Sequence, residues 1–342
     1  MGVGMNRAAW LLADALRDPA TTADLDPAGW TSLLAMARAE QLIGSLAHRL
    51  GGLPVPIAVA RLLVDARASA EQGRVAALWE AEMARRALAP LDLPVVLLKG
   101  TAFVAAGLAA GQGRSIGDLD ILVPRNALDA VEAALLASGW EWVKPDPYDD
   151  SYYRRWMHEL PPLIHRDRDR MIDVHHSILP LTARITPDPA AIIADSIALE
   201  YGLRVPAPAD MIVHAAAHLF ADGDLAGGMR NLWDVDRLIG EFGLTGVAAR
   251  AAHHGLTHEV CRAVRLAHAL YGTEIPADWA TPNRTDALYL RRLTARDGWG
   301  RAIRPVTRFG FYVRSHWLRM PPHLLARHLW TKWRGNRPSA RL

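Results

Sequence analysis

The 342-residue chain has very little of what cross-linked and membrane-spanning proteins need. Its single cysteine, Cys261, excludes an internal disulfide and any zinc site built from several cysteines, which fits a reducing compartment. No apolar run approaches the roughly 18 to 20 residues of a membrane-spanning helix. The apolar start is interrupted by Asp14 and Arg17, which favours an amphipathic helix over a signal peptide. We therefore expect a cytoplasmic protein.

Phenylalanine and tyrosine are also scarce, with 5 Phe and 7 Tyr in the chain. Alanine and leucine dominate the apolar fraction instead, and both favour helix. With 51% hydrophobic and 22% charged residues, the composition is that of a globular protein and not of a disordered or fibrous one. A chain of this length can bury a sizeable core and would ordinarily hold two domains, or one domain with large extensions.

Acidic residues are nearly absent from the C-terminal end. Residues 291–342 hold 13 of the 39 Lys and Arg residues but only one of the 36 acidic residues, Asp297. The net charge of +3 therefore conceals an acidic body and a basic tail. The tail, residues 301–342, is also rich in aromatic residues and has three interpretations. It is an amphipathic helix packed on the body, a nucleic-acid-binding surface, or a surface for an anionic membrane or another anionic partner.

The order of predicted elements divides the chain into four regions. Residues 1–90 predict an N-terminal helical region without a chemical motif, in which a long helix covers about 58–88. Residues 91–185 alternate between short apolar strands and helices. Residues 186–300 predict a second, C-terminal helical region, and residues 301–342 a basic, aromatic-rich helical tail.

The region 91–185 predicts a small sheet with helices between its strands. Its first strand, 95–98, ends in a turn at Lys99-Gly100, and a glycine-rich loop around Arg114 precedes the second strand. The other predicted elements are helices over 101–110 and 127–137, strands over 118–123 and 140–143, a loop over 144–153, and a hairpin with arms 163–165 and 171–178.

Two aspartates stand one residue apart in the second strand. Side chains alternate between the faces of a strand, so Asp118 and Asp120 point to one side and Leu119 and Ile121 to the other. Two carboxylates held side by side repel each other unless a cation lies between them, and oxygen ligands suit a hard ion such as Mg²⁺. The pattern predicts a metal site, although solvent-exposed acids at a strand end are an alternative.

A third carboxylate occurs downstream in the second arm of the hairpin. There Asp173 and His175 alternate with Ile172 and Val174, which places the aspartate and the histidine on one face. Asp173 either completes a metal site or forms a salt bridge with an arginine of the turn at 166–170. His175 and the adjacent His176 either contact substrate or support Asp173, or are packed strand histidines.

The ordered set of Lys99-Gly100, Arg114, the string Gly117-Asp118-Leu119-Asp120 and the later Ile172-Asp173-Val174-His175-His176 resembles the polymerase-beta-like nucleotidyltransferase superfamily. Within it, the chain resembles a bacterial branch described as uncharacterised nucleotidyltransferases, over roughly residues 95–238. The resemblance implies an α+β fold, with a small, mixed, mostly antiparallel sheet flanked by N-terminal and C-terminal helical regions.

The resemblance also implies a site for two Mg²⁺ ions, with Mn²⁺ as an alternative ion. By that analogy Asp118 and Asp120 hold both metals, and Asp173 completes the site that activates an acceptor hydroxyl. The nucleoside triphosphate (NTP) would be bound by Lys99, Gly100, Thr101 and Arg114. The interval from Gly100 to Asp118 is longer than in the simplest members of the superfamily.

Three other patterns resemble ligand-binding motifs but are incomplete. His214 and His218 have the i, i+4 spacing of zinc ligands, but no third ligand is evident, so core histidines are favoured. His158-Glu159 lacks the second histidine that a metalloprotease motif requires. Gly111-Gln112-Gly113 follows a helix and precedes a strand, the reverse of the order in a dinucleotide-binding motif.

The leading hypothesis is an Mg²⁺-dependent enzyme that moves a nucleoside monophosphate (NMP) from an NTP to an acceptor hydroxyl and releases pyrophosphate. The alternative is a catalytically silent nucleotide-binding protein with an accessory or regulatory role. The resemblance permits a small molecule, a peptide, a protein or an RNA as the acceptor.

Overall fold

The computed structural model describes residues 7–144, 147–281, 283–319, 321 and 325. The protein is a mixed α/β structure, 59% helical, with one seven-stranded sheet. The sheet has the order β3-β4-β5-β2-β1-β7-β6, and four of its six strand pairings are antiparallel. The prediction of a mixed, mostly antiparallel sheet flanked by helices is confirmed, while the polymerase-beta-like topology and the four region boundaries stay predictions.

The strands of the sheet are short. They are β1 (Val96–Leu97), β2 (Asp118–Leu122), β3 (Trp140–Trp142), β4 (Leu163–His165), β5 (Met171–His175), β6 (Ile197–Ala198) and β7 (Arg204–Val205).

Helices lie before, between and after the strands. They are α1 (Arg7–Arg17), α2 (Pro27–Ala39), α3 (Ile43–Arg49), α4 (Ile57–Leu88), α5 (Lys99–Ala105), α6 (Leu128–Ala137), α7 (Pro147–Trp156), α8 (Pro189–Ala194), α9 (Pro208–Ala217), α10 (Gly228–Phe242), α11 (Val247–His253), α12 (Thr257–Tyr271), α13 (Asp286–Leu293) and α14 (Pro305–Arg319).

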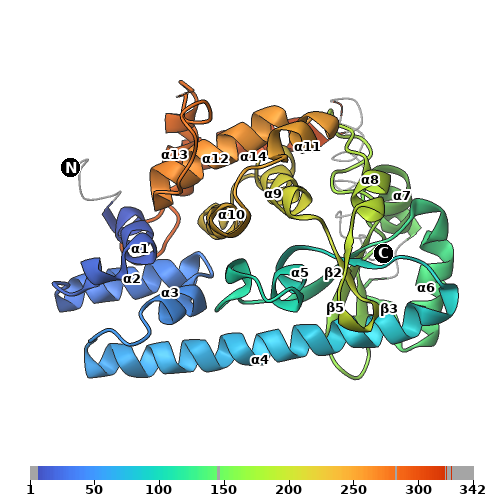
Figure 1. Ribbon diagram of the computed structural model, residues 1–342, viewed down its shortest axis with the longest axis horizontal. Helices are drawn as coiled ribbons and strands as arrows, with labels where there is room; N and C mark the ends of the chain where they lie inside the picture. Colours follow the sequence, from blue (N-terminus) through green and yellow to red (C-terminus); the bar gives the residue numbers. More distant parts are fainter. Residues whose placement is uncertain (1–6, 145–146, 282, 320, 322–324, 326–342) are drawn as a thin grey trace, which may run out of the picture.

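Helix α4 is the long support of the molecule. It spans 32 residues and runs along one side, beneath α5 and on towards the sheet, with α3 packed on its first half (Figure 1). At the sheet end, the Glu80 carboxylate of α4 accepts two hydrogen bonds from the Arg168 guanidinium, at 2.7 and 3.0 Å. Arg168 lies in the turn between β4 and β5, so this ion pair ties the long helix to the hairpin that carries Asp173.

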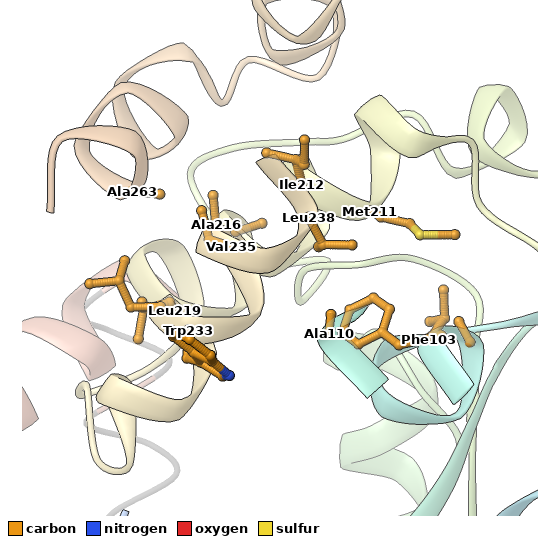
Figure 2. Packing of buried hydrophobic residues seen from close by; sticks show 14 of the residues in the cluster. Phe103, Ala110, Met211, Ile212, Ala216, Leu219, Trp233, Val235, Leu238 and Ala263 are labelled. Atoms are coloured by element: carbon orange, nitrogen blue, oxygen red, sulfur yellow. The ribbon is translucent and has the colours of Figure 1, made fainter. Parts of the chain in front are cut away.

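The C-terminal helices pack over α5 on the side away from α4 (Figure 1). The core there is built from α9, α10 and α12, and Figure 2 shows Phe103 and Ala110, from α5 and the turn after it, facing Met211 of α9 and Leu238 of α10. All four side chains belong to one continuous cluster of buried hydrophobic residues. The sheet, α5 and the C-terminal helices are thus held by a shared core.

Polar contacts reinforce the C-terminal helices. Asp210, which is 1% exposed, accepts hydrogen bonds from Arg250 at 2.5 and 2.7 Å and lies 3.2 Å from His254 Nε2. Burial by itself raises the pKa of Asp210, but the hydrogen bonds from His254 and Arg250 outweigh it and lower the pKa below its usual value.

The glycine-rich loop after α5 is a packing element. Gly113 has a φ of +66°, and a Cβ atom at this position would come within 2.3 Å of the Gly44 carbonyl oxygen of α3. Only glycine permits this approach of two backbones. The loop therefore packs against α3, in agreement with the rejection of a dinucleotide-binding motif there.

Three predicted elements differ from the structure. Within the predicted loop 144–153 a helix, α7, begins at Pro147, because a proline suits the first helical turn. The predicted helix 101–110 begins at Lys99 and ends at Ala105, followed by a separate 3₁₀ turn at Ala109–Gly111. The strands β6 and β7 interrupt the predicted C-terminal helical region; each has two residues, too few to show an alternating pattern.

The described part of the basic tail contains α14. Phe311 is buried there and lies edge to face on Tyr289 at 5.0 Å between ring centroids, while Phe309 and Trp317 are exposed. This agrees with an amphipathic helix packed on the body. Most of the predicted tail beyond α14 lies outside the described residues. Among the helices that the structure describes, none combines the length and apolar character that crossing a membrane requires.

Candidate active site

Three carboxylates meet where β2 and β5 run side by side. The two strands are parallel, and their register pairs Asp120 with Asp173 and Leu122 with His175. Because side chains alternate along each strand, Asp118, Asp120 and Asp173 lie on the same face. One oxygen atom from each of the three carboxylates lies within 4.8 Å of the others. The structure thus brings together the three aspartates that the sequence predicts as metal ligands.

The three aspartates differ in exposure. Asp118, at the first residue of β2, is exposed, Asp173 is half-buried, and Asp120 is 4% exposed. Burial, and then the negative charges of Glu159 and Asp120, raise the pKa of Asp173 to about 7. A cation among these oxygens would relieve this repulsion, and an all-oxygen donor set suits Mg²⁺ or Mn²⁺. The chemistry and spacing of the carboxylates fit a divalent metal ion.

Asp120 is held from two sides. Its Oδ1 atom accepts a hydrogen bond from Lys99 Nζ at 2.6 Å and lies 2.8 Å from His175 Nε2. Burial by itself raises the pKa of Asp120, but the Lys99 charge and the His175 hydrogen bond outweigh it and hold the pKa well below its usual range. Asp120 is therefore ionised, and both contacts use the same oxygen, so Oδ2 takes no part in them.

Lys99 occupies an unusual backbone conformation beside this carboxylate. Its φ of +49° lies in the left-handed region, which non-glycine residues rarely adopt. Such strain persists where surrounding contacts hold it, and here the ion pair with Asp120 anchors the side chain. Burial lowers the pKa of Lys99, but the Asp120 charge outweighs it and raises the pKa above the usual value. Lys99 thus places a positive charge beside Asp118, Asp120 and Asp173, which together form the acidic centre.

The next two predicted nucleotide-binding residues are buried. Gly100 lies against Arg114, and a Cβ atom at Gly100 would come within 2.5 Å of Arg114 Nη1. Thr101 is 1% exposed, and among the described residues its hydroxyl oxygen has no hydrogen-bond partner. A side chain at position 100 would have to displace the Arg114 guanidinium, whereas contact of Gly100 and Thr101 with a phosphate stays a prediction.

Arg114 pairs with Asp234 of α10. Its Nη2 and Nε atoms donate hydrogen bonds to Asp234 Oδ2 at 2.8 and 3.3 Å. Asp234 also lies 3.2 Å from Arg230, so one buried carboxylate serves two arginines. The sequence predicts Arg114 as a phosphate ligand, and the structure shows it in an ion pair. It is formed with a distant helix and not with Asp118.

His175 and His176 play different parts. His175 is 1% exposed and contacts Asp120 directly, so it belongs to the acidic centre. His176 is also buried, and burial together with the Arg125 charge lowers its pKa to about 4. Within the described residues His176 forms no hydrogen bond or ion pair with the three aspartates. The structure thus assigns the supporting position to His175.

The family comparison covers all of these residues. The sequence model of a family described as uncharacterised nucleotidyltransferase matches residues 26–272. The chain belongs to this family. The match takes in Lys99, the three aspartates and both histidines, and membership supports a transferase activity. Comparison with curated proteins finds no match.

Two residues beside His175 in this nucleotidyltransferase are candidate functional residues that the sequence did not predict. Glu159 forms an antiparallel bridge to His175, and its Oε2 atom lies 3.5 Å from His175 Nδ1. The adjacent His158 ring lies 5.2 Å from the His175 ring between centroids. The only signal in the sequence was His158-Glu159 itself, which was set aside because it lacks the second histidine that a metalloprotease motif requires.

The other pair of histidines in the nucleotidyltransferase lines a cavity. His214 and His218 line a cavity of about 50 Å³ together with Lys99, Arg114 and Asp234. Burial lowers the pKa of His214 well below its usual value and that of His218 to about 3, so both rings are neutral. Neither histidine belongs to a group of candidate metal ligands in the described residues; His214 is buried and His218 is half-buried.

The expected alternative for Asp173 does not occur. In the described part of the chain Asp173 forms no ion pair, and Arg168 of the nearby turn pairs with Glu80 instead. Asp173 is therefore not neutralised by the hairpin that carries it. Its carboxyl group lies beside Asp118 and Asp120, where a bound cation would relieve the repulsion among the three groups.

Proposed function

We propose that this nucleotidyltransferase moves an NMP from an NTP to an acceptor hydroxyl and releases pyrophosphate, in a reaction that depends on two divalent metal ions. The observation that carries the proposal is the convergence of Asp118, Asp120 and Asp173, with one oxygen of each within 4.8 Å of the others. Family membership supports the reaction class. The donor set favours Mg²⁺, with Mn²⁺ as the alternative.

The three aspartates have distinct places in this proposal. Asp118 and Asp120 would hold both ions, and Asp173 would complete the site next to the acceptor. Two ions bound there would stabilise the attacking oxygen and the departing pyrophosphate of an in-line displacement. The acceptor oxygen attacks the α-phosphorus, and the bond from the α-phosphorus to the oxygen of the departing pyrophosphate breaks. The Asp173 carboxylate would accept the hydroxyl proton.

Lys99 and His175 act on Asp120. Lys99 donates to Asp120 Oδ1 at 2.6 Å, so its charge lies beside the place where the triphosphate would approach the ions. His175 holds the same oxygen at 2.8 Å and orients the carboxylate. In this proposal Lys99 also donates hydrogen bonds to phosphate oxygens when the NTP binds. Arg114 contacts phosphate only if its ion pair with Asp234 breaks. Gly100 and Thr101 donate hydrogen bonds from their backbone N–H groups.

The test uses isosteric removal of charge. Wild-type protein, Asp118→Asn and Asp120→Asn are incubated with each of the four labelled NTPs, Mg²⁺ and a cell extract that supplies acceptors. The label should appear in a product with wild type but not with Asp118→Asn or Asp120→Asn. Asp24→Asn, at an exposed position, serves as the control and should retain wild-type transfer. Unchanged transfer by both site variants would contradict the proposal.

A catalytically silent nucleotide-binding role is the second candidate. It is favoured by the state of Asp120, whose Oδ1 atom is already engaged by Lys99 and His175. If this state persists in the presence of nucleotide, the protein binds NTP without turnover. If calorimetry detects binding of NTP and Mg²⁺ but no extract yields a labelled product, the protein binds nucleotide without catalysing transfer.

A further inference from the structure

The segment before β4 places a histidine and a glutamate beside His175. Leu160 N donates to the Val174 carbonyl at 2.9 Å, and His176 N donates to the His158 carbonyl at 2.8 Å. These bonds flank Glu159 and His175, which therefore form a non-hydrogen-bonded antiparallel pair, the type in which opposing side chains lie closest. Pro161 and Pro162 lack N–H groups and separate this bridge from β4. The backbone thus holds Glu159 against His175.

The atoms that face each other in this pair are two acceptors. If His175 Nε2 carries the proton that is donated to Asp120, Nδ1 has only a lone pair, which faces Glu159 Oε2. Their separation of 3.5 Å exceeds a hydrogen bond, and His175 Nδ1 is a buried atom with no hydrogen-bond partner among the described residues. Two ligands of one tetrahedral ion with bonds of about 2.1 Å lie about 3.4 Å apart.

His158 supplies the third donor. Its Nε2 atom lies 3.9 Å from Glu159 Oε2, and its Nδ1 atom, like that of His175, is buried and has no hydrogen-bond partner in the described part of the chain. One donor atom from each of the residues His158, Glu159 and His175 lies within 4.8 Å of the others.

We propose that His158, Glu159 and His175 form a second metal site, selective for a borderline-soft divalent ion of the Zn²⁺ class. Two imidazoles and one carboxylate suit this class, whereas the neighbouring all-oxygen centre suits Mg²⁺. Three protein ligands leave a fourth position of the ion for water or another ligand. An ion on His175 Nδ1 fixes the proton on Nε2 and thereby holds the hydrogen bond to Asp120 in place.

The site is independent of the proposed nucleotidyl transfer, and its test needs no activity. Chelator-treated protein is dialysed against Zn²⁺ in the presence of millimolar Mg²⁺, and bound zinc is measured by mass spectrometry. Wild type should retain about one zinc ion per chain. His158→Gln and Glu159→Gln should bind zinc at least tenfold more weakly, and far-ultraviolet circular dichroism shows whether each variant is folded.

Matched controls separate the two metal centres. Glu141→Gln and His253→Gln change exposed residues of the same types and should bind zinc like wild type. Asp118→Asn, which alters only the acidic centre, should also retain zinc, whatever happens to transfer. Co²⁺ in place of Zn²⁺ should give the strong visible absorption of a tetrahedral site. The proposal is overturned if wild type retains no zinc, or if folded His158→Gln and Glu159→Gln retain as much zinc as wild type.

Discussion

Replacing Asp173 by asparagine is expected to stabilise the metal-free protein although it removes a proposed catalytic residue. Asp173 is half-buried beside Asp118, Asp120 and Glu159, and burial and these charges raise its pKa to about 7. The ionised side chain is therefore unfavourable in the folded state. Asparagine has nearly the same shape without the charge, so the substitution removes the repulsion and leaves the packing in place.

The size and the pH dependence follow from the pKa. A carboxyl group with a raised folded-state pKa contributes stability that is complete below its unfolded pKa, here 3.8, and is lost as the pH rises to about 7. The folded-state and unfolded-state pKa values of Asp173 differ by about three, and a difference of one is worth about 1.4 kcal/mol. The ionised carboxylate can therefore destabilise the fold by at most about 4 kcal/mol. Side-chain relaxation and water entry reduce such penalties, so we expect Asp173→Asn to add about 1 to 2 kcal/mol at pH 8.

Urea unfolding in EDTA, followed by circular dichroism, measures this difference. Asp173→Asn should unfold at a higher urea concentration than wild type at pH 8, and the advantage should shrink as the pH falls towards 4. Asp120→Asn should have the opposite sign, because Lys99 and His175 lose their shared carboxylate. The control Asp24→Asn, at an exposed position, should match wild type. An Asp173→Asn protein that is no more stable than wild type at pH 8 would refute the reasoning.

Three further outcomes test the metal centre and its supports. Mg²⁺ at 100 times its dissociation constant should stabilise wild type by about 2.7 kcal/mol in urea unfolding, and Asp118→Asn should lose most of this gain; equal gains would argue against Asp118 as a ligand. Arg168→Gln leaves Glu80 buried without its cation and should cost about 2 kcal/mol, below the roughly 3 to 5 kcal/mol of a fully buried pair because Arg168 is 25% exposed. The exposed Arg166→Gln is its control and should cost under about 0.5 kcal/mol. Asp210→Ala, at a 1% exposed residue, should cost about 3 kcal/mol or more in thermal or urea unfolding, and a loss below about 1 kcal/mol would show that its ion pair with Arg250 is dispensable.

Local patterns in the sequence were enough to predict which carboxylates share one face of a strand. The alternation of Asp118 and Asp120 with apolar residues, and of Asp173 with Ile172 and Val174, depends only on the geometry of a strand. The same holds for the hairpin, whose two apolar arms flank a charged turn. Short or locally ambiguous elements were not predicted, as the helix α7 and the two-residue strands β6 and β7 show.

Partners that are distant in the chain could not be predicted from such patterns. Arg114 was predicted as a phosphate ligand, but the packing of α10 against the 3₁₀ turn Ala109–Gly111 brings Asp234 to it. Similarly, Asp173 was expected to bind either metal or an arginine of its own turn, and the arrival of Glu80 from α4 takes Arg168 away from it. A charged side chain has no periodicity that identifies its partner, so only the fold decides the pairing.

By itself, the sequence determined which residues face the same side of each strand, because that depends on the two-residue repeat of the backbone. The tertiary structure decided which strands are neighbours and in what register. The parallel pairing of β2 with β5 places Asp173 beside Asp120, and the bridge at Glu159 brings His158 to His175 from 17 residues away. Register depends on the packing of the whole sheet and its helices, and it brought together His158, Glu159 and His175, which the sequence pattern did not connect.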